Sequence, residues 1–198
     1  MTMKKRLIPV MVAAVIAIAA PSESKALGIP YPNVGTAAPV STFTATSSGD
    51  IWAYFYGSDA AYASTIGLRV NNISTGVFGL PNHFSSYGDA LNLGYANLGD
   101  VLEFELVVPA LGHSWYSNPV NNVDTLNHAY AAPFAGDSFI PAGIYVGFED
   151  LAGGGDLDYN DHQFVFVGVS QRVPDAGVTS ALLGVALAGL GLIKRKLA

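Results

Sequence analysis

The sequence predicts an all-β domain, an antiparallel β-sandwich of which the jelly roll is one form. Between residues 41 and 171, short runs rich in β-branched and aromatic residues alternate with clusters of Gly, Asn, Asp, Ser and Pro. Such runs form strands and such clusters form turns. No stretch in this interval sustains a helical period, and no fixed-period repeat indicates a solenoid or propeller. Many short strands with frequent turns are typical of sandwiches and barrels, and of the two we expect a sandwich.

The first strands follow a stretch rich in Pro, Gly and Ala, residues 27–40, which we interpret as a leader or linker. The run 51–56 then alternates, with Trp52, Tyr54 and Tyr56 on one face and its other three residues on the opposite face. An aromatic face of this kind could stack on sugar rings, but it is more often part of a core. We therefore expect the three rings to be buried.

The run 100–109 shows the clearest alternation. Its apolar residues Leu102, Phe104 and Leu106 point one way, while Glu103 and Glu105 point the other way. This pattern predicts a half-buried antiparallel strand with the two glutamates on a solvated edge. A catalytic carboxylate pair of the glycosidase kind is a much weaker interpretation of the same two residues. In chain order, the expected strands are 41–46, 51–56, 65–70, 100–109, 144–148 and 163–169.

The N-terminus has the three parts of a secretory signal peptide. The basic run 4–6 precedes an apolar run from Leu7 to Ala20, and Ser24-Lys25-Ala26 places small residues at a cleavage site. We expect a signal helix in residues 1–26, with cleavage after Ala26. The mature chain would then leave the cytoplasm.

The C-terminus, residues 173–198, has a second three-part pattern. A short Pro- and Gly-containing motif precedes the apolar stretch from Ala181 to Ile193, and Lys194-Arg195-Lys196 follows. Counted from Ala176, the apolar part predicts a short transmembrane helix whose basic end stays in the cytoplasm. The motif is Val173, Pro174, Asp175, Ala176 and Gly177.

This order of motif, helix and basic tail resembles the PEP-CTERM sorting signals of Gram-negative bacteria. The motif is closest to the V-P-D-S-G variant, with Ala176 in the serine position. The resemblance implies that an exosortase-type enzyme recognises the tail. It also implies an inner-membrane-anchored precursor and a final location at the cell surface or in the exopolysaccharide matrix. A plain C-terminal membrane anchor is the alternative.

The central domain is acidic and lacks cysteine. From Leu27 to Val173 there are thirteen acidic residues and two basic ones, Arg69 and Arg172, which gives a formal charge of −11. A surface with this charge repels nucleic acid and attracts cations, so we expect no nucleic-acid partner. Because the chain has no Cys, disulfides and thiolate sites are excluded, and stability must come from the core or from bound metal.

The most acidic stretch lies between the last two expected strands. Residues 149–161 hold five carboxylates and one side-chain amide around three consecutive glycines, with no Lys or Arg. Carboxylates this close repel one another unless a cation lies among them, and a Gly-bent loop of oxygen ligands suits Ca²⁺ better than Mg²⁺. Asp59 is a further candidate ligand from another loop. The predicted metal ligands are Glu149, Asp150, Asp156, Asp158, Asn160 and Asp161.

The loop is not an EF-hand, because Asp161 stands where that motif needs Gly and Val167 stands where it needs a bidentate Glu. Residues 148–161 instead resemble the F-E-D-x-x-G-G-G-D-x-D-Y-N-D signature of a bacterial domain of unknown function, frequent in secreted and PEP-CTERM proteins. Residues 56–62 and 127–129 also resemble positions of that domain. The resemblance implies a β-rich extracellular module with a calcium site and no transferable enzymatic activity. An Asx-rich hairpin with solvated carboxylates is the alternative.

The sequence therefore predicts a non-enzymatic, exported β-sandwich that binds Ca²⁺ and has a structural or adhesive role. The alternative function is a calcium-dependent carbohydrate-binding module, in which Trp115 and Tyr116, in an expected loop, contact extracellular polysaccharide. The four histidines lack the spacing of a zinc site, and no motif of a hydrolase, metalloprotease or nucleotide-binding protein is present.

Overall fold

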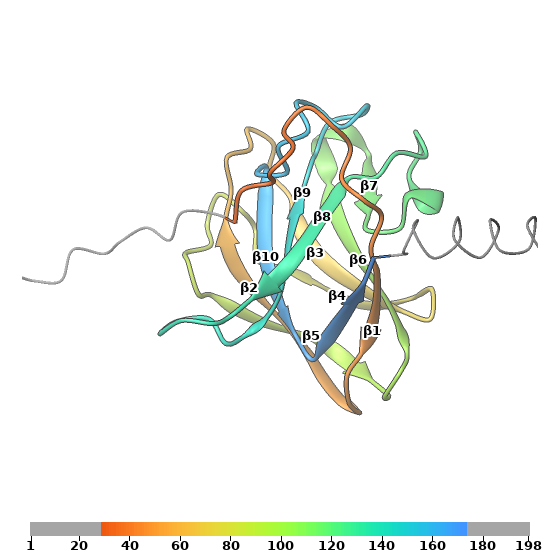
Figure 1. Cartoon of the computed structure of the whole chain (residues 1–198), viewed down its shortest axis with the longest axis vertical. Helices are drawn as coiled ribbons and strands as arrows, with labels where there is room; N and C mark the ends of the chain where they lie inside the picture. The colour runs from red at the N-terminus through yellow and green to blue at the C-terminus, as the bar shows by residue number, and fades with distance from the viewer. Residues whose placement is uncertain (1–28, 174–198) are drawn as a thin grey trace, which may run out of the picture.

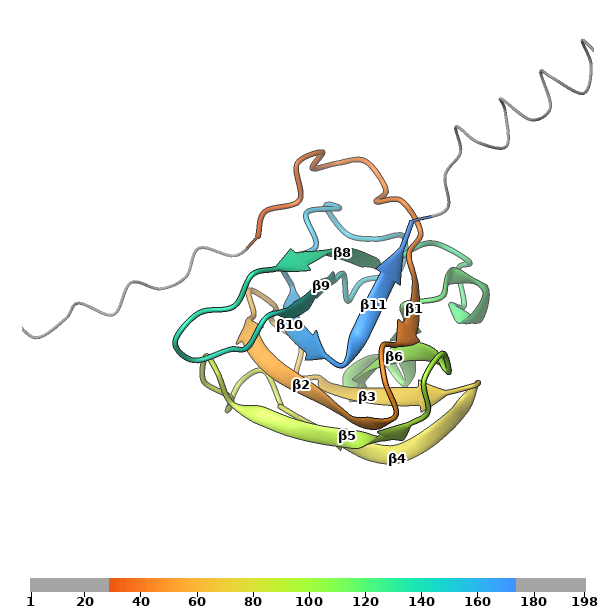
Figure 2. The same ribbon diagram turned by 60° about the horizontal axis from the view of Figure 1, so that its bottom comes forward.

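Two antiparallel β-sheets pack against each other in the computed structural model, which describes residues 29–173 (Figures 1 and 2). The first sheet has the order β11-β1-β6-β3-β4, with β7 paired to the end of β6. The second has the order β5-β2-β10-β9-β8. The predicted all-β class and antiparallel sandwich are confirmed. The predicted signal peptide and transmembrane helix lie outside the described residues.

The strands of the first sheet are β1 (Thr42–Ala45), β3 (Thr65–Val70), β4 (Ile73–Gly79), β6 (Val101–Val108), β7 (His113–Tyr116) and β11 (Val169–Arg172). Those of the second sheet are β2 (Gly49–Gly57), β5 (Ala90–Ala96), β8 (Ala129–Phe134), β9 (Gly143–Phe148) and β10 (His162–Val167). Two short 3₁₀ helices, η1 (Pro109–Leu111) and η2 (Pro119–Asn121), flank β7. Within residues 29–173, no helix has the length and apolar character that a bilayer crossing needs.

The core lies between the sheets and follows the period-2 alternation of the strands. Phe104 of β6 stacks on Phe166 of β10, with ring centroids 3.6 Å apart and planes inclined by 11°. Ile51 and Phe55 of β2 also point inward and are buried. The inward face predicted for the run 100–109 is confirmed.

The outward face of β6 differs from the prediction. Glu103 and Glu105 are 3% and 8% exposed, so they do not lie on a solvated edge. The segment 112–119, expected to be a loop, contains β7, which pairs with β6, and side chains of β7 and η2 donate hydrogen bonds to the two glutamates. Arg69 of β3 reaches both carboxylates, with Nε 3.3 Å from Glu103 and Nη1 4.0 Å from Glu105. A cation on the neighbouring strand allows the two acids to be buried.

The residues before β1 belong to the packed structure from Ile29 onward. Tyr31 and Ala38 are 4% and 5% exposed, and they pack against Tyr159. The Ala38 backbone amide donates a hydrogen bond to the Tyr159 hydroxyl at 2.8 Å, and the Asn127 side-chain Nδ2 donates to the Ala38 carbonyl at 2.9 Å. The stretch predicted as a leader or linker therefore lies against the sandwich next to the acidic loop (Figure 2).

Candidate metal centre

The acidic loop joins β9 to β10 at one end of the second sheet. These strands are antiparallel neighbours with His162 opposite Phe148, so residues 149–161 form the connection of a wide hairpin. Two turns fold it, with the Gly154 amide donating to the Leu151 carbonyl and the Leu157 amide donating to the Gly154 carbonyl, both at 3.0 Å. The three glycines, 153–155, all have positive φ, a conformation that costs little without a Cβ. The glycines thus let the chain double back and gather its carboxylates.

Three of the predicted ligands come together. One carboxylate oxygen from each of Glu149, Asp156 and Asp158 lies within 4.8 Å of the others. Among residues 29–173, no other three acidic or histidine side chains are close enough together to hold a metal ion. We call it the acidic triad.

Glu149 is the buried member of the acidic triad. Its side chain is 1% exposed, and its Oε1 accepts a hydrogen bond from the Tyr159 amide at 2.5 Å. Its Oε2 is buried and has no hydrogen-bond partner among the described residues. A Cβ added to Gly155 would lie 2.6 Å from Oε2, so glycine at this position keeps the space beside that oxygen open. A buried carboxylate oxygen without a partner is costly, which makes a cation beside it favourable.

The electrostatics of the loop also favour a cation at the acidic triad. Burial, and then the charges of Asp161, Asp156 and Asp158, raise the pKa of Glu149 to about 8. Burial and the charges of Asp156 and Asp59 also raise the pKa of Asp158. No Lys or Arg of the described residues forms an ion pair with the acidic triad. The negative charge of the triad is therefore not compensated by the protein itself.

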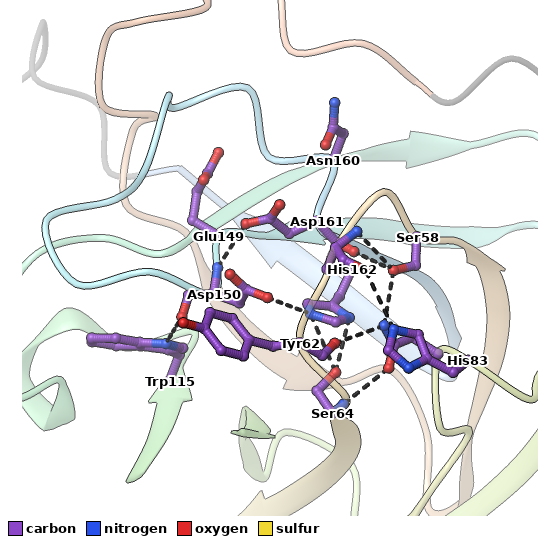
Figure 3. Close-up of polar contacts among 12 residues, drawn as sticks. Ser58, Tyr62, Ser64, His83, Trp115, Glu149, Asp150, Asn160, Asp161 and His162 are labelled. Carbon is purple, nitrogen blue, oxygen red and sulfur yellow. Dashed lines mark hydrogen bonds and ion pairs between the residues drawn. The ribbon is translucent and has the colours of Figure 1, made fainter. Parts of the chain in front are cut away.

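Two predicted ligands have other partners. Asp150 is 3% exposed, and its Oδ2 lies 3.1 Å from His162 Nε2, on the opposite side of the chain from Glu149 (Figure 3). Asp161 Oδ2 accepts the Asp150 amide at 2.9 Å, and burial followed by the Asp150 charge raises the pKa of Asp161 to about 6. Both side chains hold the base of the hairpin together rather than pointing at the triad.

The other two candidates lie beside the triad. The Asn160 amide nitrogen donates to Asp158 Oδ2 at 2.5 Å, so this side chain orients a triad carboxylate. Asp59 is exposed, and its backbone amide donates to the Asn160 carbonyl at 3.2 Å. Asp59 thus adds negative charge near Asp158 from the loop after β2.

Ser64, His162 and Asp150 form a chain of hydrogen bonds that resembles a hydrolase triad. Ser64 Oγ lies 2.8 Å from His162 Nδ1, and His162 Nε2 lies 3.1 Å from Asp150. The three side chains belong to residues that are 2%, 0% and 3% exposed, so a substrate has no access to the hydroxyl. The chain instead connects the start of β3 to the base of the acidic loop (Figure 3).

A second set of contacts fixes the other side of the loop, and sequence reasoning missed it. The His128 ring stacks on Trp115 with centroids 3.8 Å apart, and its Nδ1 lies 3.1 Å from the Glu149 carbonyl. Its Nε2 lies 3.0 Å from Asp124 Oδ2, the oxygen that also accepts the Gly153 amide at 2.9 Å. The only sequence indication was that 127–129 resemble positions of the domain of unknown function.

The expectation that Trp115 and Tyr116 lie in an exposed loop is wrong. Trp115 lies in β7, is 0% exposed and donates its indole N–H to the Asp150 carbonyl at 2.7 Å. Tyr116 is half-buried, with its hydroxyl 3.3 Å from Glu105 and its ring 5.6 Å from the Arg69 guanidinium. Neither ring forms an exposed stacking surface, because β7 is a strand packed on β6 and not a loop tip.

Comparison with known proteins identifies the tail. Residues 172–197 match the family model of the VPDSG-CTERM motif, a sorting tail of the PEP-CTERM kind. The predicted variant of the motif is thereby confirmed. Such a tail implies processing by a sorting enzyme, export, and a membrane-anchored precursor. No curated protein and no solved structure matches the chain. The match is confined to the tail, so the resemblance of residues 148–161 to the domain of unknown function stays a prediction.

Proposed function

We propose that this protein is a non-enzymatic, surface- or matrix-associated β-sandwich whose acidic triad binds Ca²⁺, and that the bound ion gives the domain its stability outside the cell. The matching tail supports an exported location. Attachment to a Gram-negative envelope or exopolysaccharide matrix is part of the proposal. The role that follows is structural or adhesive.

The observation that carries the proposal is that Glu149, whose Oε2 is buried and unpartnered, lies with two further carboxylates in one group close enough to hold an ion. Hard cations with oxygen ligands fit this donor set, and thiolate- or imidazole-seeking metals do not. Ca²⁺ accepts six to eight oxygens in flexible geometry, so backbone carbonyls of the glycine-rich turn and water can complete its coordination. Mg²⁺ requires stricter octahedral geometry and fits this loop less well.

A structural role follows from what the loop holds together. Tyr159, between Asp158 and Asn160, packs under the segment 29–40, and the Gly35 amide donates to the Leu157 carbonyl at 3.3 Å. On its other side the loop is tied to Asp124 and His128. An ion that orders residues 149–161 thus stabilises three segments at once. Because the chain contains no Cys, metal binding takes the place that disulfides have in many exported domains.

Thermal unfolding of the full chain in EDTA and in millimolar Ca²⁺ tests the proposal. Ca²⁺ should raise Tm by several degrees, because a ligand that binds only the folded state stabilises it. The double variant Asp156→Asn, Asp158→Asn should lose the increase, while Asp50→Asn, an exposed acid at the far end of β2, should keep it. Equal melting curves with and without Ca²⁺ would contradict the proposal, and an equal response to Mg²⁺ would contradict the choice of ion.

A further inference from the structure

The outer face of the second sheet carries an exposed group of aromatic and polar side chains. Period-2 alternation points residues 50, 52 and 54 of β2 outward. Register places Asn92 of β5 beside Trp52 and Tyr95 beside Asp50. We call this group the outer-face patch, and its members are Asp50, Trp52, Tyr54, Asn92 and Tyr95.

Two of the three rings of the outer-face patch, Trp52 and Tyr95, are open to solvent. Trp52 and Tyr95 are 37% and 59% exposed, and Tyr54 is half-buried over Val165, which is itself covered. The prediction that the aromatic face of β2 is wholly buried is correct only for Tyr56, at 7% exposed. Among the described residues, the Trp52 indole N–H and the Tyr54 and Tyr95 hydroxyls have no hydrogen-bond partner. None of these three rings contacts another aromatic ring. Their faces and their polar atoms are both available to a ligand.

The polar members of the patch are already oriented. Asn92 Nδ2 donates to Asp50 Oδ2 at 2.9 Å, and Asn92 Oδ1 accepts the Gly94 amide at 2.9 Å. Asp50 is thereby oriented beside Tyr95 and presents an acceptor to a ligand. Rigid aromatic faces with a few positioned polar groups are what a ligand with one apolar face and a hydroxylated rim requires.

The charge and size of the patch narrow the ligand further. Neither β2 nor β5 contains Lys or Arg, and the domain from Leu27 to Val173 has a formal charge of −11, so a polyanion would be repelled. Five side chains are also few compared with the roughly 20–30 residues per side of a stable protein interface. We propose that the outer-face patch binds a neutral polysaccharide, with Trp52 and Tyr95 stacking on sugar rings and Asp50 accepting from sugar hydroxyls.

This site is separate from the acidic triad. The patch lies toward the Gly49 end of β2, whereas the acidic loop contacts the residues after the Gly57 end, through Asp59. Sugar binding here needs no bound ion. The inference therefore differs from the calcium-dependent module predicted from Trp115 and Tyr116, both in its residues and in its metal requirement.

Affinity electrophoresis of the full chain, in a detergent without a sugar headgroup, tests the inference. The probes are hydroxyethylcellulose, laminarin and galactomannan as neutral polysaccharides, with alginate as the anionic comparison. At least one neutral probe should retard the protein in EDTA as in Ca²⁺. Trp52→Ala should weaken the retardation about tenfold or more, and Tyr95→Ala should weaken it less. Phe84→Ala removes a ring that is 86% exposed outside the patch and should leave binding unchanged.

Fluorescence gives a second readout that does not depend on mobility. The chain has two tryptophans, and because Trp115 is 0% exposed, quenching by acrylamide reports on Trp52. A bound neutral polysaccharide should reduce this quenching. No retardation by any neutral probe, binding that survives Trp52→Ala, or binding of alginate alone would overturn the inference. So would a dimer that Trp52→Ala dissociates, because the patch would then be an interface between copies of the chain.

Discussion

The molecule buries carboxylates in two places, and the groups that surround them differ. On the outer face of β6, Glu103 and Glu105 lie beside Arg69, and Asn121, Ser114 and Tyr116 donate further hydrogen bonds to them. We call these six residues the Arg69 cluster. In the acidic loop, Glu149 is as deeply buried as Glu103, but its neighbours are Asp156 and Asp158.

The difference shows what each site lacks. A buried carboxylate is tolerated when a cation and hydrogen-bond donors surround it, and the Arg69 cluster supplies both from the chain. The acidic triad has one backbone donor to Glu149 Oε1 and no cationic side chain. The Arg69 cluster thus has a cation from the chain itself, whereas under our proposal the acidic triad takes one from solution.

The largest effect is expected from removing Arg69. Arg69→Met would leave Glu103 and Glu105 buried without a cation and should lower the free energy of unfolding by about 2–3 kcal/mol, less than for a fully buried pair because Arg69 is partly exposed. Denaturant unfolding measures the loss, which should be the same in EDTA and in Ca²⁺. Arg172→Met, at an exposed position, is the control and should change stability little. A loss that Ca²⁺ restores would contradict the contrast.

Glu149→Gln should be more stable than the wild type without the ion and should lose this advantage when Ca²⁺ is present. In EDTA near neutral pH the variant should be more stable than the wild type by about 1–2 kcal/mol, because the wild-type side chain must take up a proton or bury an uncompensated charge on folding, whereas the amide is neutral and can donate to the neighbouring carboxylates. Ca²⁺ should raise the stability of the wild type but not that of the variant. Unfolding in EDTA and in Ca²⁺ measures the stability differences, and titration calorimetry measures the loss of Ca²⁺ binding. A variant that is destabilised in EDTA yet still responds to Ca²⁺ would show that Glu149 is not the critical ligand.

The pH dependence of stability should also report on the uncompensated burial of Glu149. The pKa of Glu149 is about 8 in the folded state against an ordinary 4.5, so the folded protein keeps a proton that the unfolded chain releases between those values. Its contribution to the free energy of unfolding therefore falls as pH rises from about 4.5 to about 8, and is constant outside this window. Unfolding in EDTA at several pH values, for wild type and Glu149→Gln, isolates this contribution as their difference. Equal slopes for the two proteins would contradict it.

The smallest effect is expected from a matched pair of glycine substitutions. Gly155→Ala and Gly153→Ala both place a Cβ at positive φ, +55° and +83°, so each should cost about 1 kcal/mol of stability. Only Gly155→Ala puts that Cβ 2.6 Å from Glu149 Oε2, whereas nothing lies within 4 Å of one at Gly153. Calcium affinity should therefore fall in Gly155→Ala alone. Equal Ca²⁺ affinities of the two variants would show that Gly155 does not contribute to the metal site.

Strands with clear alternation could be predicted from sequence, and weakly patterned ones could not. Thr65–Val70 was placed at its observed bounds, and β6 within one residue at each end. The missed strands include β5, ALNLGYA, and β8, AYAAPF, whose Ala, Gly, Asn and Pro residues have low strand propensity. Pro133 is tolerated because β8 is the edge of its sheet. These strands exist because their neighbours pair with them, which local sequence does not encode.

The candidate site could be located from sequence but not divided into roles. The density of carboxylates around three glycines indicated the loop. Which acids face the triad depends on long-range contacts, since Asp150 is drawn to His162 and Asp161 to the Asp150 amide. Burial of Glu103 and Glu105 was missed for the same reason, because Arg69 lies thirty-four residues earlier and only strand pairing places it opposite Glu103. Spacing alone carries no information on such partners.

The pairing of β1 with β11 has a mechanical consequence. The two strands are antiparallel with Thr42 opposite Arg172, so the chain enters the pair and leaves it toward the sorting tail at the same end. Tension between the tail and the segment before β1 would load the terminal rung first and open the four-residue ladder one rung at a time, like a zipper. The second sheet shares no strand with this pair. Tension between the two ends of the domain would therefore act on the β1–β11 pair before it reaches the second sheet.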